Sequence, residues 1–344
     1  MSHARGDSDG ILRIRLAEPD LGHLDELLTE MERRAGSGSA EQLVEIAHDL
    51  ARRLPPALQG PLDSMRLWES PVGLVMSGYQ VDDRGIGPTP TSWHHAAAQP
   101  REELLLLLLT APLGQPYAWR TQQGGQLVHD ILPTQGDEHV QLGSSSTTEL
   151  LWHTEDAFHE SRCDYLGLLC LRNDDGVSTT VSVPDVTLLP PRIRAVLAEP
   201  LFHILPDDSH LSTRNPDSSD DAERAGHFTD IQRRVTDPPP TPVLFGPEER
   251  PYLRIDPAYM TPMPGSASAT EALREVCALI DGSLREVVLG AGDVLVLDNF
   301  RAVHGRRPFH ARYDGRDRWL KRVSVTRDLR RQRMAARTVT GLAV

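Results

Sequence analysis

The sequence predicts a mainly β protein with flanking helices, built as one jelly-roll barrel. Short apolar or alternating runs, separated by turn residues, recur between residues 116 and 325, as in barrels of antiparallel strands. Helical periodicity is concentrated before residue 115. The 344 residues are long enough to bury a sizeable core. We therefore expect one domain, with a mainly helical N-terminal layer at 1–115, a barrel core at 116–325 and a C-terminal tail at 326–344.

The expected elements of the N-terminal layer are an edge strand, two helices, a strand with its turn and a third helix: 11–16, 24–35, 39–54, 67–78 and 101–110. Alternating apolar and basic residues predict the edge strand, and apolar stripes of helical period predict the helices. Ser39 and Gln42 have the spacing of a capping box, so the second helix begins there. Pro55 and Pro56 end it, because proline lacks the N–H that a helix interior needs.

The expected elements of the barrel core are strands at 119–133 (with a central turn), 165–171, 177–183, 252–255, 294–297 and 318–325, and helices at 190–199 and 270–280. The run from Val294 to Leu297 is continuously apolar, which is typical of a buried strand. Turn residues at 173–176 separate the expected strands at 165–171 and 177–183.

Residues 207–227 differ from the rest of the core. They are rich in Asp, Ser and His and have almost no large apolar side chains, so they cannot order themselves by burial alone. A long segment of this kind is either a disordered insertion or an active-site lid. We favour a lid, because predicted strands hold it to the core on both sides.

Charge and composition exclude several classes of protein. The formal net charge is −13, with 49 acidic and 36 basic residues, which argues against a general nucleic-acid or anionic-membrane binder. The arginines of 327–337 are interpreted as a local, solvated end. The segment 1–10 lacks an apolar signal core, and the longest apolar run, 104–109, is too short to span a bilayer. Three cysteines without zinc spacing suggest reduced thiols in a cytoplasmic protein.

A metal site is predicted from three residues. On a strand, His153 and Glu155 face the same side, with Cα atoms about 6.6–6.8 Å apart, so they are able to share one ion. Such a pair is common by chance, but His304 follows a buried strand and precedes arginines 14 and 18 residues later. Two histidines and one carboxylate leave open positions on Fe(II) for a co-substrate and oxygen. Asp156 is expected to point away from this site.

Two arginines indicate what accompanies the metal. Arg318 and Arg322 lie on the strand face opposite Trp319 and Lys321. A buried arginine needs an anion, and a dicarboxylate co-substrate would supply one through a bidentate contact. Arg306 and Arg307 lack this patterning and are interpreted as surface residues.

Other chemistries receive less support. The sequence contains no Gly-x-Ser-x-Gly elbow, no Gly-x-Gly-x-x-Gly loop and no P-loop. Zinc hydrolysis stays open, since two histidines and a glutamate also bind catalytic zinc. The two arginines favour iron and a dicarboxylate.

Four segments together resemble the clavaminate synthase-like Fe(II)/2-oxoglutarate oxygenases: 152–158, 164–168, 298–306 and 311–322. The likeness extends from about residue 122 to residue 322 and is strongest to the branch that hydroxylates free arginine, asparagine and related amino acids in peptide antibiotic pathways. It implies a double-stranded β-helix with Fe(II) bound by His153, Glu155 and His304, and 2-oxoglutarate and O2 as co-substrates.

The resemblance also implies roles around the iron. Arg318 would hold the distal carboxylate of 2-oxoglutarate, helped by Thr180. Arg322 would hold the carboxylate of the amino acid, and Gln122 with Glu155 its ammonium group. Asp207 and Ser209 belong to the segment that matches the substrate-closing lid of this branch.

One departure bears on the substrate. Relatives that hydroxylate arginine carry two acidic residues where this chain has Asp256 and Ala258, so half of the guanidinium clamp is absent. We expect a less demanding side chain, citrulline first and enduracididine next, hydroxylated at C3 or C4. Arginine and asparagine are alternatives, the former if Asp207 or Asp208 completes the clamp.

Two rival functions receive less support than the hydroxylase. A halogenase would need an open iron position for chloride, which Glu155 occupies. A non-catalytic metal-binding jelly roll has no use for Arg318 and Arg322 on a buried face.

Overall fold

The structure is a computed structural model that describes residues 3–6, 10–36, 38–98, 100–215, 222–336 and 342–343. Its largest sheet has the strand order β1-β2-β3-β14-β7-β16-β4, with β5 also paired to β16. In this order, with β5 last, the strands are His3–Gly6, Ile11–Arg15, Gly73–Ser77, Val294–Asp298, Tyr165–Arg172, Trp319–Thr326, Gln115–Tyr117 and Val128–Ile131.

A smaller sheet has the order β13-β8-β15-β6, formed by Arg285–Val287, Thr179–Ser182, Val303–Arg306 and Leu150–His153. Two short strand pairs accompany it: Leu244–Phe245 (β10) with Tyr252–Leu253 (β11), and Phe202–Ile204 (β9) with Met260–Pro262 (β12). The mainly β jelly-roll class predicted from the sequence is confirmed.

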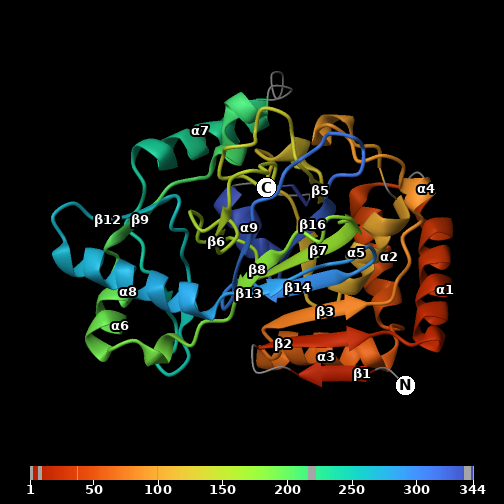
Figure 1. Cartoon of the computed structure of the whole chain (residues 1–344), viewed down its shortest axis with the longest axis horizontal. Helices are drawn as coiled ribbons and strands as arrows, with labels where there is room; N and C mark the ends of the chain where they lie inside the picture. The colour runs from red at the N-terminus through yellow and green to blue at the C-terminus, as the bar shows by residue number, and fades with distance from the viewer. Residues whose placement is uncertain are drawn as a thin grey trace.

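Helices pack outside the sheets in two groups (Figure 1). The first group is α1 to α5: Glu18–Ala35, Ala40–Ala51, Pro56–Trp68, Asp83–Ile86 and Pro100–Thr110. The second is α6 to α8: Pro191–Ala198, Ala222–Thr236 and Ala267–Ser283. Helix α9, Leu329–Ala336, lies near the centre of the view in Figure 1. Figure 1 shows α1, α2 and α5 on one side of the molecule and α6 with α8 on the opposite side.

Helix α5 joins the N-terminal layer to the large sheet. Its leucines are buried in the same apolar cluster as residues of β7 and β16. Gly167 of β7 permits this contact, because a Cβ there would lie 3.0 Å from Thr110 and 2.9 Å from Val323. Pairing of β3 with β14 also links this layer to the core. That the whole chain forms one domain stays a prediction, which these contacts support.

Two expectations for the N-terminal layer need correction. The strand at 11–15 is not an edge strand, because β2 pairs with β1 on one side and runs parallel to β3 on the other. The capping box of Ser39 and Gln42 is present as predicted. However, Pro56 stands at the start of a further helix, α3, which the sequence patterns did not predict. Proline suits the first helical turn, where no N–H is needed.

Three expectations for the core change as well. Of the two strands expected within 119–133, only the second forms, as β5 at Val128–Ile131, because residues 119–122 form no strand. The lid segment contains two short 3-10 turns, Asp208–His210 and Ser212–Arg214, and the start of α7, while its residues 216–221 lie outside the described residues. The tail is not simply a solvated end, because Leu329 and Leu342 are buried against Tyr117.

Candidate active site

The structure brings His153, Glu155 and His304 together. Nε2 of His304 lies 3.3 Å from Oε2 of Glu155, and Nε2 of His153 lies 3.7 Å from the same oxygen. The two imidazole centroids are 4.6 Å apart. One atom from each residue thus converges on a point at the edge of the small sheet.

Strand pairing explains how two residues far apart in sequence meet here. His153 ends β6 and is the direct cross-strand partner of His304 in β15, so both side chains leave the sheet on the same face. Glu155 lies beyond the end of β6. Its backbone N–H donates to the side chain of Asn299 at 2.7 Å, and the Asn299 amide donates back to the Glu155 carbonyl at 3.0 Å. No sequence pattern pointed to Asn299, which anchors the loop that carries Glu155.

Charges around the triad keep the glutamate ionised. Burial alone would raise the pKa of Glu155, but the charge of Arg322 and hydrogen bonds from both histidines lower it well below its usual range. Burial also lowers the pKa of His153, yet the hydrogen bond to Glu155 and the charge of Asp256 outweigh burial and raise it to about 9. Protons and a metal ion compete for the same Nε2 atoms.

The donor set fits a divalent first-row metal with open positions. The three donor atoms all lie within 4.8 Å of one another. Nδ1 of His153 is 2.8 Å from the Leu151 carbonyl, a contact that fixes the ring and leaves Nε2 for the ion. Two imidazoles and one carboxylate on one side of an ion are the arrangement of non-haem Fe(II) oxygenases.

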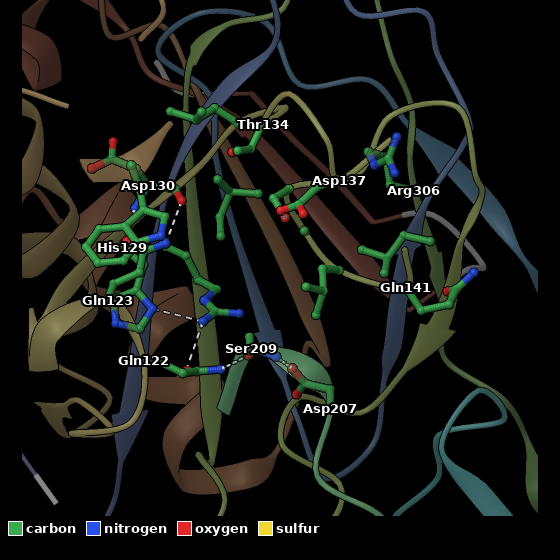
Figure 2. A pocket seen from close by; sticks show the side chains of 18 of the residues that line it. Gln122, Gln123, His129, Asp130, Thr134, Asp137, Gln141, Asp207, Ser209 and Arg306 are labelled. Carbon is green, nitrogen blue, oxygen red and sulfur yellow. Dashed lines mark hydrogen bonds between the residues drawn. The ribbon is translucent and has the colours of Figure 1, made fainter. Parts of the chain in front are cut away.

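A cavity of about 420 Å³ opens next to this point, between the two sheets. Its wall includes residues of both sheets and of the segment that begins at Asp207. Figure 2 shows His129 and Gln122 on one side of the cavity and Arg306 on the other. Every sequence-predicted site residue except Thr180 lines it.

Arg318 reaches the cavity from the start of β16. It is buried, and its Nη2 donates to Oγ1 of Thr179 at 2.9 Å. Thr180, the hydroxyl expected from sequence, is paired with Gly305 and does not line the cavity. Adjacent strand residues face opposite sides of a sheet, so the hydroxyl beside Arg318 is that of Thr179.

Arg322, in the middle of β16, is the centre of a hydrogen-bond network. Its guanidinium forms an ion pair with Glu155 and donates to Oε1 of Gln122 at 3.3 Å and to Nδ1 of His129 at 2.9 Å. Gln122 donates in turn to Oγ of Ser209 at 2.6 Å. Glu155 of the triad is thereby connected, through Arg322 and Gln122, to Ser209 of the expected lid. His129 was not predicted from the sequence.

Burial lowers the pKa of His129 to about 3, with a further contribution from Arg322. The imidazole is therefore neutral at physiological pH, and its Nδ1 is free to accept the hydrogen bond from Arg322. A neutral acceptor here orients the guanidinium without cancelling its charge.

Two carboxylates, those of Asp207 and Asp256, line the cavity beside Ala258. Burial, with a smaller contribution from the negative charge of Asp207, raises the pKa of Asp256 to about 6 against the opposing effect of the His153 charge. One oxygen of Asp256 accepts from the backbone N–H of Ala258 at 3.0 Å, and one of Asp207 accepts from that of Ser209 at 2.9 Å. These hydrogen bonds use one oxygen of each carboxylate, and the second oxygen of Asp207 lies 4.0 Å from Nε2 of His210.

Asp156 turns away from the triad, as expected. Its carboxylate accepts from Nε1 of Trp119 at 2.6 Å and from Nε2 of His210 at 3.1 Å. Both of its oxygens are therefore used within the protein. Arg307 is a surface residue as predicted, with ion pairs to Glu149 and Glu286. The same prediction for Arg306 is wrong, since that residue is 2% exposed.

A jelly roll that carries two histidines and one carboxylate at such a cavity defines a class of non-haem iron oxygenases. The comparison with family models agrees. Residues 101–324 match the Taurine catabolism dioxygenase TauD, TfdA family, and this chain belongs to that family.

Curated relatives cover almost the whole chain. An enduracididine beta-hydroxylase of Streptomyces hygroscopicus is 39% identical over 338 residues, 96% of this chain and 98% of that protein. An L-ornithine/L-arginine 3-hydroxylase of Catenulispora acidiphila is 40% identical over 329 residues, 93% of this chain and 96% of that protein.

Solved structures of similar proteins include the non-heme iron oxygenase OrfP in complex with Fe, succinate and (3S)-hydroxy-L-Arg. It has a TM-score of 0.90 at 43% identity and covers 96% of this chain and 98% of that chain. OrfP in complex with Fe and alpha-ketoglutaric acid has a TM-score of 0.85 at 40% identity and covers 96% and 99%. In the described part of this chain, no helix has the length and apolarity needed to cross a membrane.

Proposed function

We propose that this protein hydroxylates C3 of a free amino acid that carries a guanidinium-type side chain, arginine or its cyclic derivative enduracididine. The chemistry is that of an Fe(II)/2-oxoglutarate-dependent amino acid hydroxylase. Bound iron and the co-substrate would supply the oxidation: 2-oxoglutarate is converted to succinate and CO2, and one oxygen atom of O2 enters the amino acid while the other enters succinate. The chain's own residues bind and orient the two organic molecules.

The observation that carries the proposal is the distribution of charge in one cavity. Arg318 with Thr179 suits the distal carboxylate of 2-oxoglutarate. Arg322 suits the carboxylate of the amino acid, and the amide oxygen of Gln122 suits its ammonium group. Asp207 and Asp256 then supply two carboxylates for the side chain.

These two carboxylates favour a cation over a neutral ureido group. The negative charge of Asp207 raises the pKa of Asp256, and a guanidinium with five N–H donors bound by both carboxylates would relieve that repulsion. The sequence favours citrulline because Ala258 leaves the clamp half empty. Asp207, on the segment at the cavity mouth, fills the missing half in the present proposal.

The relatives support the same class and position. They include an enduracididine beta-hydroxylase and an L-ornithine/L-arginine 3-hydroxylase, and β and 3 denote the same carbon. A 3-hydroxylated cationic amino acid fits a building block for a peptide antibiotic. The non-catalytic alternative leaves Arg318 and Arg322 without a role and is set aside.

The test is a substrate panel with purified protein, Fe(II), 2-oxoglutarate and O2. Arginine, enduracididine, citrulline, ornithine and asparagine are compared by mass spectrometry and the product carbon is identified by NMR. Arginine or enduracididine should give a C3-hydroxylated product and an equal amount of succinate. A preference of more than about tenfold for citrulline or asparagine, a gap worth roughly 1.4 kcal/mol, would contradict the substrate proposal.

The metal ligands are tested in the same assay. His153→Ala and His304→Ala each remove one donor atom and should abolish Fe(II) binding and turnover. His310→Ala, an exposed histidine outside the cavity, is the matched control and should behave like the unmodified enzyme. Full activity in either ligand variant would mean that the triad is misassigned.

A further inference from the structure

Arg306 is a buried cation that the proposed binding roles leave unused. It lies two residues after His304, lines the cavity and is 2% exposed. Figure 2 shows it across the cavity from His129 and Gln122. An arginine is seldom buried to this degree unless an anion or a set of acceptors holds it.

Strand register places Arg306 beside the group that binds Arg318. Arg306 of β15 is the direct cross-strand partner of Thr179 in β8, as His304 is of Val181. Directly opposed residues of antiparallel strands project on the same face, with Cβ atoms about 4.5–5.5 Å apart. The Thr179 hydroxyl accepts a hydrogen bond from Arg318. The Thr179 side chain thus lies between the buried guanidinium groups of Arg306 and Arg318.

Neutral oxygens hold Arg306 in this position. It donates to the carbonyls of Ser146 at 3.0 Å, Arg307 at 3.2 Å and Thr148 at 3.1 Å, and to Oγ of Ser145 at 2.7 Å. Its guanidinium carbon also lies 4.9 Å from the centre of the Phe309 ring. None of these groups cancels its positive charge.

Arg318 lacks a counter-charge in the same way. Among the residues that the structure describes, no carboxylate lies within ion-pair distance of Arg306 or Arg318. By contrast, Arg322 has Glu155 as a partner and the neighbouring Arg307 has two glutamates. One part of the cavity therefore carries two buried positive charges, and the carboxylate whose charge acts on Arg306, that of Glu149, is ion-paired with Arg307.

We propose that Arg306 is a second positioning cation for the distal carboxylate of the 2-oxoacid co-substrate. Arg318 makes the direct contact, and Arg306 acts from behind Thr179 through its charge. The proposal rests on the proposed function, because it assigns the dicarboxylate to the Arg318 end. The proposal gives this role to Arg306 and not to Arg307, which carries the same charge but lies at the surface.

The experiment measures co-substrate binding rather than turnover. Isothermal titration calorimetry under anaerobic conditions gives the dissociation constant between 2-oxoglutarate and the Fe(II)-loaded enzyme. Arg306→Gln should raise this Kd about tenfold, since an interaction with a full charge in a low-dielectric site is lost. Arg306→Lys keeps the charge and should stay within about threefold of the unmodified enzyme. Arg307→Gln is the matched control and should bind 2-oxoglutarate normally.

A second probe locates the effect. 2-Oxopentanoate keeps the 2-oxoacid group but has no distal carboxylate, so it should bind more weakly than 2-oxoglutarate. Its Kd, measured by competition, should be the same for Arg306→Gln and the unmodified enzyme. The Kd for the amino acid should stay within about twofold, because its charges face Arg322 and the aspartates.

Three results would overturn the proposal. The first is that Arg306→Gln binds 2-oxoglutarate as tightly as the unmodified enzyme. The second is that Arg306→Gln loses as much affinity for 2-oxopentanoate as for 2-oxoglutarate. The third is an equal loss of affinity for the amino acid, which would indicate general damage to the fold. If Arg306→Gln does not fold by circular dichroism, Arg306→Lys decides, and a tenfold weaker affinity there would reject the role of charge. Absence of hydroxylated product from the unmodified enzyme would instead reject the proposed function.

Discussion

Nε2 of His210 donates a hydrogen bond of 3.1 Å to Asp156, the residue that follows the proposed metal ligand Glu155. Nδ1 of His210 lies 2.8 Å from the hydroxyl of Thr121, and the ring packs against Trp119. The first turn of the expected lid is therefore fixed in the core next to the triad. Any movement of the lid would begin after His210.

His210→Ala should release this turn and with it Ser209, which contacts Gln122. We expect the KM for the amino acid to rise about tenfold or more, because small displacements of positioning groups are costly. The affinity for 2-oxoglutarate should change little. Steady-state kinetics and the ratio of succinate to hydroxylated product measure the effect, with His310→Ala as control. An unchanged amino acid KM would show that the contact does not position the substrate site.

Arg318 and Arg322 should have separable roles. Arg318→Ala should raise the KM for the co-substrate about tenfold or more, because a charge-assisted contact with 2-oxoglutarate is lost. Arg322→Ala should mainly raise the KM for the amino acid, although loss of its ion pair with Glu155 should also weaken Fe(II) binding. Initial rates with each substrate varied in turn provide the measurement. Interchanged phenotypes would contradict the assignment of the two carboxylates.

The paired carboxylates should set the preference for a cationic side chain. Asp207→Asn and Asp256→Asn should each lower kcat/KM for arginine about tenfold or more and affect citrulline less, because only arginine loses a charge interaction. Asp208→Asn, a neighbouring carboxylate that does not line the cavity, is the control. Ala258→Asp should move the preference further toward arginine. Competition assays that find the ratio of the unmodified enzyme in Asp207→Asn, Asp256→Asn and Ala258→Asp would disprove this account.

Asp298 should make stability depend on pH. Burial raises its pKa from 3.8 to about 7. Below pH 3.8 both folded and unfolded states hold the proton; as pH rises toward 7 only the unfolded state releases it, so stability falls. Above pH 7 the loss is complete.

Asp298→Asn removes this carboxylate but keeps an acceptor for the backbone N–H of Phe300, which lies 2.9 Å from Oδ1 of Asp298. The variant should gain roughly 1–3 kcal/mol over the unmodified protein at about pH 8 and much less at about pH 4. Urea unfolding at both pH values measures the difference. A gain that is equal at the two pH values would contradict the raised pKa.

The sequence by itself determined the features that depend on neighbouring residues. Alternation along a strand assigned Arg318 and Arg322 to one face and Lys321 to the other, and in the structure Lys321 pairs with Glu103 and Asp130 away from the two arginines. The capping box at Ser39 is equally local, since both of its hydrogen bonds join residues three apart. Such patterns need only the geometry of one strand or one helix.

Tertiary structure alone decided which face of a strand meets the cavity and what holds a buried charge. Arg306 resembles Arg307 in sequence, but three of its four hydrogen-bond acceptors belong to a loop about 160 residues away, at 145–148. Thr179 and Thr180 are equivalent until the register with β15 opposes Thr179 to Arg306. The contact of His210 with Asp156 spans 54 residues. Chain connectivity does not encode these pairings locally, because they form only when separate elements pack and exclude water.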